Sequence, residues 1–207
     1  MPGTLLPPEI LMELTEMAAR ILREVLELDD KGVEFGNGMP AWAYIVEHSI
    51  EATVAGVLVG RRLMPEDRLG PLALGLFLQD IGKLALPERI VQKPSALDPD
   101  EWDLMMQHPL LGLQFLRDDS MPSAAKAVVR GHHERWDGSG YPDSLIGDEI
   151  ALVARIAAVA DVFDAVTSER WHAPHVPPHE GVEIIRAGAG TAFDPVVVEA
   201  FLATVAS

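Results

Sequence analysis

Apolar residues recur along most of this chain at intervals of three and four, the spacing that places them on one face of an α-helix. Together with the Pro and Gly residues that begin or end helices, this spacing predicts helices at about 7–28, 41–63 and 66–86. Further helices are predicted to begin near 98, 122, 148 and 194. No stretch longer than a few residues alternates between apolar and polar, as a half-buried strand would. The pattern therefore predicts an all-α chain.

The charge balance limits the partners of the protein. The 207 residues include 16 Lys and Arg against 32 Asp and Glu, a formal net charge of −16. A nucleic-acid polymer or an anionic membrane is not expected as a partner, because both attract clustered cations. A small anionic substrate would need local positive charge, which metal ions can supply.

The chain has no Cys, which excludes disulfides and Cys-bound zinc. It also lacks an apolar run of about 18 residues and a basic leader at the N-terminus, so a cytoplasmic protein is expected.

Six ionisable side chains stand on five different predicted helical segments in largely apolar surroundings: His48, Asp80, His108, His132, His133 and Asp161. A buried carboxylate is costly unless it is paired or binds a cation, so the set is a candidate metal site. Imidazole and carboxylate ligands suit Fe, Mn, Zn or Ni. Each histidine alone is better explained as a hydrogen-bonded core residue, and only the set favours a metal. Lys83, three residues after Asp80, would either grip a phosphate or pair with Asp80.

The run HHERWDGSGYP at 132–142 marks the point where a predicted helix meets a rigid loop. Adjacent histidines cannot share one face of a continuous helix, so His132 and His133 converge only at its end. The glycines of the run permit backbone conformations closed to other residues, and its proline blocks helix continuation. Ligand-binding residues often lie in such loops.

Three long motifs, in order along the chain, resemble those of the HD-GYP subgroup of the HD phosphohydrolase superfamily. They are DIGKLALPERIVQKPSALDPDEWDLMMQHP at 80–109, HHERWDGSGYP at 132–142 and ARIAAVADVFDAVTSER at 154–170. The resemblance runs from about Tyr44 to Val197. It implies an HD-type helical bundle with additional N-terminal and C-terminal helices. The chain would divide into a helical extension and loop at 1–40 and an HD-GYP domain at 41–207.

The resemblance also implies an activity, the hydrolysis of cyclic di-GMP to pGpG or GMP at two divalent ions. Fe or Mn is favoured over Zn, Ni or Mg. The matching positions give the first metal the ligands His48, Asp80 and Asp161. They give the second metal the ligands Asp80, His108, His132 and His133.

The remaining functional positions follow from the same resemblance. Asp80 would bridge the two metals and Lys83 would contact the phosphate, as the catalytic pair. The candidate substrate contacts are Lys83, Asp164, Arg170 and Arg135. Gly140, Tyr141 and Pro142 form the loop at which members of the subgroup meet signalling proteins.

The chain departs from the subgroup at the doublet that names it, which here is Gln79-Asp80. An amide oxygen is a poorer metal ligand than imidazole, so the first site is expected to be weakened, with Gln79 a weak ligand or none. Tyr44 stands where some members carry a Glu that holds a third metal, so two metals are expected. Ala173 removes a basic substrate contact.

These departures leave alternatives open. A catalytically degenerate domain that binds a nucleotide or a signalling protein would keep the same motifs without turnover. A hydrolase of another phosphate ester would also fit, since one fold serves many reactions. The amphipathic helix predicted at 7–28 would either pack on the domain or form a homodimer.

Overall fold

The computed structural model describes residues 41–116, 121–168 and 175–206. Throughout these ranges the regular elements are helices, accompanied by isolated β-bridges and no strands. The α-helices are α2 (Ala41–Leu63), α3 (Leu69–Leu78), α4 (Glu88–Val91), α5 (Pro99–Met105), α6 (His108–Phe115), α7 (Ser123–Gly131), α8 (Leu152–Thr167), α9 (Pro178–Ala187) and α10 (Pro195–Val205). The 3₁₀ helices are η1 (Glu66–Arg68), η2 (Ile81–Ala85) and η3 (Gly147–Glu149). The prediction of an all-α fold is confirmed.

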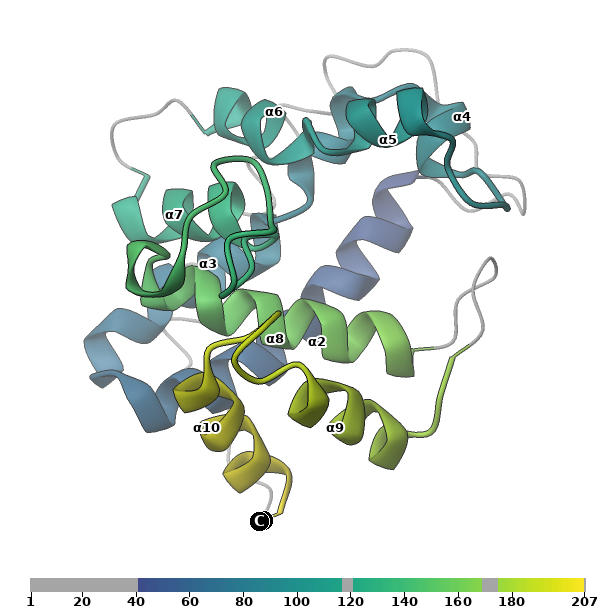
Figure 1. The fold of residues 1–207 in the computed structure, drawn as a ribbon. Helices are drawn as coiled ribbons and strands as arrows, with labels where there is room; N and C mark the ends of the chain where they lie inside the picture. The colour runs from purple at the N-terminus through teal and green to yellow at the C-terminus, as the bar shows by residue number, and fades with distance from the viewer. Residues whose placement is uncertain (1–40, 117–120, 169–174, 207) are drawn as a thin grey trace.

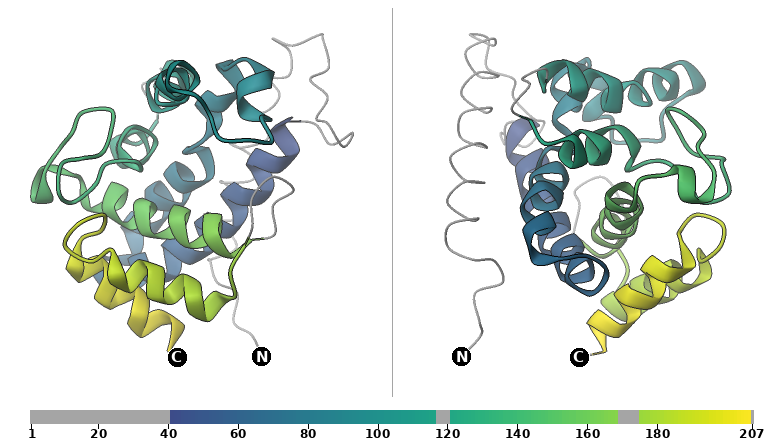
Figure 2. Two further views of the ribbon diagram at one scale, coloured as in Figure 1. Left: turned by 45° about the vertical axis from the view of Figure 1, so that its right-hand side comes forward. Right: turned by 90° about the vertical axis from the view of Figure 1, so that its left-hand side faces the viewer.

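Helices α2, α3, α7 and α8 pack against one another and form the centre of the bundle (Figure 1). At one end of the bundle, α9 and α10 pack on α8, and α10 also contacts α2. At the other end α6 packs on η2, and the short helices α4 and α5 contact each other (Figure 2). None of the described helices is both long and apolar enough to cross a membrane.

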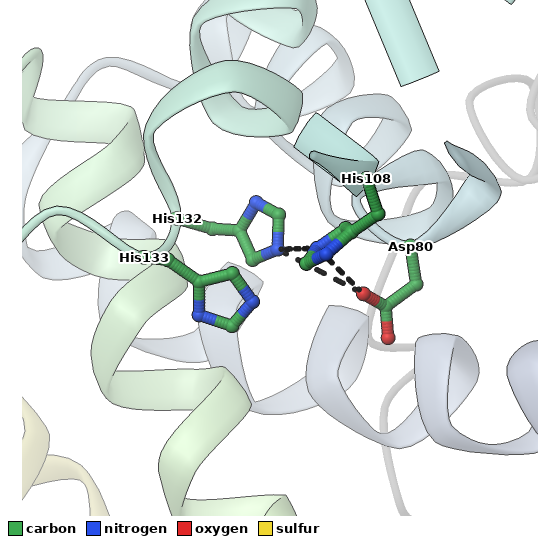
Figure 3. Close-up of side chains that lie close together, drawn as sticks. All are labelled: Asp80, His108, His132 and His133. Carbon is green, nitrogen blue, oxygen red and sulfur yellow. Dashed lines mark hydrogen bonds and ion pairs between the residues drawn. The ribbon is translucent and has the colours of Figure 1, made fainter. Parts of the chain in front are cut away.

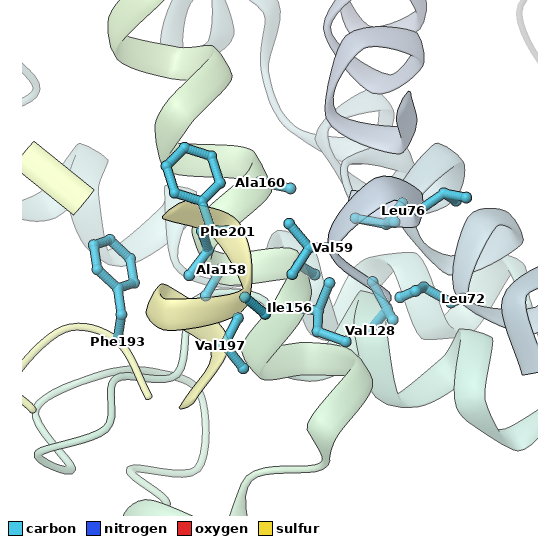
Figure 4. Packing of buried hydrophobic residues seen from close by; sticks show 14 of the residues in the cluster. Val59, Leu72, Leu76, Val128, Ile156, Ala158, Ala160, Phe193, Val197 and Phe201 are labelled. Atoms are coloured by element: carbon cyan, nitrogen blue, oxygen red, sulfur yellow. The ribbon is translucent and has the colours of Figure 1, made fainter. Parts of the chain in front are cut away.

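The core between the central helices is built from their apolar faces. Leu72 and Leu76 of α3 meet Val128 of α7 and Ile156 of α8, and all four side chains are fully buried (Figure 4). Phe201 brings α10 onto the same core. This packing fixes α3, α7 and α8 relative to one another, and these helices carry or precede most of the candidate ligands.

Two predicted helix starts are confirmed by their caps. Asp98 accepts a hydrogen bond from Glu101 N at 3.0 Å, and Glu101 accepts one from Asp98 N at 2.9 Å, which is a complete capping box at the start of α5. Asp194 accepts from Val196 N at 2.8 Å and begins α10.

The prediction of one continuous helix at 66–86 is wrong. The segment consists of η1, α3 and η2, and the α-helical geometry ends between Gln79 and Asp80. In the 3₁₀ turn of η2, residues three apart stand on the same side. Lys83 therefore still meets Asp80, with Nζ 2.6 Å from Oδ2.

The helix predicted from 98 through His108 is also two helices, α5 and α6. Pro109 lacks an N–H and its ring would clash with the carbonyl of Met105, so one helix cannot run through this point. His108 Nδ1 lies 2.8 Å from that carbonyl oxygen instead. Two elements were not predicted, α4 and α9, and His179, which was assigned to a loop, lies in α9. The helix predicted at 7–28 and the extension at 1–40 lie outside the described residues.

Gly82 allows η2 to approach α6 closely. A Cβ at Gly82 would lie 1.9 Å from the carbonyl oxygen of His108 and 2.5 Å from Gly112 N, both main-chain atoms. We expect Gly82→Ala to push α6 away, to lower the free energy of unfolding by about 1–3 kcal/mol, and to separate Asp80 from His108. Urea unfolding and metal titration of the variant measure the two effects.

Gly190 offers the matched control for this substitution. A Cβ at Gly190 meets no atom within 4 Å, but the residue has a φ of +79°. Gly190→Ala is therefore expected to cost about 1–2 kcal/mol through backbone strain alone and to leave metal binding unchanged. Equal metal binding by both variants would contradict the role assigned to Gly82.

Candidate metal centre

Four of the predicted ligands form one cluster, which holds Asp80, His108, His132 and His133, with ligand atoms within 4.8 Å of one another (Figure 3). His108 Nε2 lies 3.2 Å from His132 Nε2. Asp80 Oδ1 lies 3.4 Å from His108 Nε2 and 3.8 Å from His132 Nε2. Asp80, His108 and His132 are almost completely buried.

The atoms at the centre of this cluster are acceptors that lack donors. Nδ1 of His108 donates to the Met105 carbonyl, and Nδ1 of His132 donates to main-chain carbonyls of α7 at 3.1 and 3.2 Å. A neutral imidazole that donates from Nδ1 carries a lone pair on Nε2. Two such lone pairs therefore converge with Asp80 Oδ1, which has no hydrogen-bond partner among the described residues. One shared proton would satisfy a single contact, whereas a divalent cation would satisfy all these atoms, so the donor set fits a metal ion.

The end of α7 delivers the two adjacent histidines as the sequence predicted. α7 ends at Gly131 and His132 is its C-cap residue, so His133 lies beyond the helix. Tyr141 N donates to the His133 carbonyl at 3.2 Å, and the Tyr141 ring stacks on the His133 imidazole with centroids 4.7 Å apart. Gly140 is required for this fold-back, because a Cβ there would lie 2.3 Å from Arg135 N. The Tyr141-Pro142 peptide is cis.

Glu134 fixes the loop that follows, a role that the sequence did not suggest. Its carboxylate is buried and accepts hydrogen bonds from Asp143 N at 2.6 Å and Leu145 N at 3.0 Å. A carboxylate that follows a helix end and precedes a Gly-rich loop is a usable signal for such an anchor, because the loop has unpaired N–H groups to offer. The contact fixes the loop next to the cluster of Asp80, His108, His132 and His133.

The second cluster contains His48, Asp80 and Asp161, so Asp80 belongs to both. His48 Nε2 lies 2.9 Å from Asp161 Oδ1 and 3.6 Å from Asp80 Oδ2. The other ring nitrogen, Nδ1, contacts the carboxylate of Asp164. Asp164 was predicted to contact substrate, and the structure shows it behind His48. A carboxylate at this place fixes the tautomer of a metal-binding histidine.

Ser168 extends this arrangement toward the surface. Its hydroxyl lies 2.5 Å from Asp164 Oδ1 and 2.8 Å from Glu51 Oε2. Neither Ser168 nor Glu51 was among the predicted residues. The spacing of Asp161 and Asp164, three apart on one helix, could have suggested that both face His48.

Gln79 occupies the place of the expected histidine, and its amide nitrogen acts as a hydrogen-bond donor. The side chain is completely buried, and Nε2 donates to Asp161 Oδ1 at 3.0 Å. The amide oxygen has no hydrogen-bond partner among the described residues. Gln79 therefore engages, as a donor, the same oxygen of Asp161 that lies nearest His48, and the weakening of the first metal site stays a prediction.

The two clusters differ in their protonation. Burial lowers the pKa of His108 to about 3 and holds the pKa of His133 well below its usual value. Burial also opposes a charge on His48, but hydrogen bonds to Asp161 and Asp164 outweigh it and raise the pKa of His48 to about 9. Burial alone would raise the pKa of the Asp80 carboxyl, yet the Lys83 charge and the nearby histidines hold it well below its usual range.

This difference predicts how metal binding depends on pH. A metal must displace the proton of His48, whose pKa in the metal-free protein is about 9. Affinity at the first site is expected to rise about tenfold per pH unit up to about pH 9 and then to level off. His108 and His133 are already neutral near pH 7 and release no proton. Calorimetric titration from pH 6 to 9 measures this, and a first-site affinity independent of pH below 9 would contradict it.

The remaining predicted positions are placed as follows. Lys83 pairs with Asp80 and its side chain is about one-fifth exposed, so the amino group borders the cluster. Arg135 is engaged within its loop, with Nε donating to Ser139 Oγ at 2.8 Å. Arg170 lies outside the described residues. The predicted contacts of Lys83, Arg135 and Asp164 with a substrate stay predictions.

Comparison with known proteins identifies the family to which this chain is similar. A family model described as HD domain matches residues 34–197. The probable cyclic di-GMP phosphodiesterase of Vibrio cholerae is 44% identical over 133 residues, covering 60% of this chain and 30% of that protein. The cyclic di-GMP phosphodiesterase response regulator RpfG of Xanthomonas campestris is 34% identical over 200 residues, covering 95% of this chain and 51% of that protein.

A solved structure of an HDGYP protein from Bdellovibrio bacteriovorus has the same fold, with a TM-score of 0.64 and 18% identity over 79% of this chain and 53% of that one. The chain thus spans about half or less of the length of the curated relatives. The family model covers most of the chain, and the Xanthomonas relative is 34% identical over 95% of it, so this chain belongs to the HD domain family.

Proposed function

We propose that this chain is a metal-dependent phosphodiesterase that hydrolyses cyclic di-GMP to pGpG or GMP. The observation that carries the proposal is the convergence of two imidazole lone pairs on the unpartnered Asp80 Oδ1, a donor set that fits a divalent ion. The names of the two curated relatives support the substrate.

Two metal ions, Fe or Mn, are proposed. The cluster of Asp80, His108, His132 and His133 would hold one of them, and the cluster of His48, Asp80 and Asp161 the other. Bound ions of this kind lower the pKa of water and neutralise charge on a phosphate.

The protein side chains have their own tasks in this proposal. Asp80 offers one carboxylate oxygen to each cluster, which holds the two ligand sets at a fixed separation. Lys83 stands beside Asp80 at the solvent edge, where its amino group would orient a phosphate oxygen. The stacked ring of Tyr141 keeps His133 in place and excludes water from one side of the cluster.

The test is product analysis with reconstituted protein. Metal-free protein is loaded anaerobically with Fe(II) or Mn(II), incubated with cyclic di-GMP, and the products are separated by chromatography. The proposal requires pGpG or GMP from the loaded protein and none from chelator-treated protein. Intact nucleotide with both metals would overturn it.

A second function is favoured by one observation, the donor role of Gln79 toward Asp161. If the first site binds its metal too weakly, the domain would not hydrolyse the nucleotide. It would instead bind the nucleotide, or bind a signalling protein at the loop around Tyr141. Tight binding of cyclic di-GMP by metal-loaded protein, with no product after prolonged incubation, would establish this function in place of hydrolysis.

A further inference from the structure

We propose that the indole of Trp102 stacks on a purine base of the cyclic dinucleotide while its phosphate lies at the metal centre. The proposal rests on the proposed function and names a base-recognition residue for it. Trp102 lies on α5.

A continuous series of aromatic rings connects Trp102 with the metal cluster. His133 stacks on Tyr141 with centroids 4.7 Å apart and an interplanar angle of 26°. Tyr141 in turn meets Trp102 edge to face, with centroids 6.3 Å apart and an angle of 79°. Tyr141 also lies 6.4 Å from the ring of His108. Only the ring of Tyr141 therefore lies between the indole and His133, a candidate metal ligand.

The indole of Trp102 is exposed to solvent, although large apolar side chains are usually buried. Its fractional exposure is 47%, and α5 has no buried residue. Exposed indole is an unfavourable use of a large apolar side chain unless a ligand or partner covers it. The contact with Tyr141 is T-shaped and not stacked, so the indole has no parallel stacking partner in Tyr141.

The helix that carries Trp102 is held firmly. The capping box between Asp98 and Glu101 fixes its first turn, and Glu101 also forms an ion pair with Lys93. A helix that is fixed in this way holds the backbone of Trp102 in place, so less conformational entropy is lost when the indole binds a base.

The charge of the protein favours a contribution that does not depend on charge. A cyclic dinucleotide carries two phosphates, whereas the chain has a net charge of −16 and Lys83 at the cluster is paired with Asp80. Stacking on an aromatic ring contributes about 1–3 kcal/mol per base and does not depend on charge. It acts on guanine and adenine alike, so Trp102 would recognise a purine rather than one particular base.

The experiment compares Trp102→Leu with Trp102→Phe in metal-loaded protein. The probe is the phosphorothioate analogue of cyclic di-GMP, which resists hydrolysis, and its affinity is measured by calorimetry. Trp102→Leu is expected to weaken binding about fivefold to a hundredfold, and Trp102→Phe to restore most of it. Leu110→Ala, which changes another partly exposed apolar residue of the same end of the bundle, should have no effect.

Inorganic phosphate separates base recognition from damage to the metal site. It has no base, so both Trp102 variants should bind it as the unchanged protein does, with the same metal content. Equal affinity of Trp102→Leu and unchanged protein for the nucleotide analogue would overturn the stacking role alone. Unchanged protein that binds metal and phosphate but not the analogue would overturn the proposed function, and the stacking role with it.

Discussion

Replacement of Asp80 by Asn is expected to remove most of the bound metal and to reduce cyclic di-GMP hydrolysis by at least about a hundredfold. Asp80 is the one residue that both clusters share, with Oδ1 facing His108 and Oδ2 facing His48. An amide keeps the size of the side chain but removes the charge that a divalent ion requires. Loss of outer-shell partners of metal ligands alone costs about 10- to 100-fold, so loss of a shared ligand should cost more. Elemental analysis and the hydrolysis assay measure the two effects.

The control for Asp80→Asn is the same substitution at Asp143. Asp143 pairs with Arg130 on the surface, with Oδ2 2.6 Å from Arg130 Nε, and takes no part in either cluster. Asp143→Asn should retain both metal and activity. If Asp80→Asn retained the full metal content, the two clusters could not be the sites of binding.

Replacement of Gln79 by His is expected to strengthen the first site by about tenfold or more in metal affinity. Gln79 is completely buried beside Asp161, where its amide nitrogen acts as a donor. An imidazole at this place offers a lone pair and releases the Asp161 oxygen for the metal. The rate of hydrolysis should rise with it, if filling of the first site limits turnover. Calorimetry with Mn(II) resolves the weaker of the two binding steps.

Gln79→Leu distinguishes the effect of adding a new ligand from the effect of removing the hydrogen-bond donor. Leucine has nearly the same volume and removes the hydrogen bond to Asp161 without supplying a ligand. If release of the Asp161 oxygen alone strengthened the site, Gln79→Leu would match Gln79→His. An unchanged first-site affinity in Gln79→His would show that substitution of the doublet does not weaken this site.

The candidate ligands could be predicted from the sequence because burial of a polar group in apolar surroundings is costly unless the group is paired or binds a cation. Asp161 lies within the apolar run of α8, and the burial of its carboxylate beside His48 follows from that position. The end of α7 between His132 and His133 was predictable for a similar reason, since two adjacent ligands require a break in the helix.

Other features depended on contacts between distant segments and could not be predicted. The contact of Asp164 with His48 joins residues 116 positions apart, and the role of Ser168 depends on α2 reaching the end of α8. The break at Met105 had a local signal in Pro109, whereas the break at Gln79 was missed because helical periodicity averages over a turn. A short 3₁₀ segment keeps nearly the same apolar spacing.

Bound metal would also act as a covalent crosslink does, in a chain that has no cysteine with which to form one. The two clusters draw their ligands from α2, α6, α8, the turn that begins η2 and the end of α7, so a filled centre joins five segments at one place. Binding to the folded state alone adds about 2.7 kcal/mol of stability per site at a hundred times the dissociation constant. Removal of metal would then loosen the bundle at the junction of all five segments, and resistance to proteolysis would report on metal supply as directly as activity does.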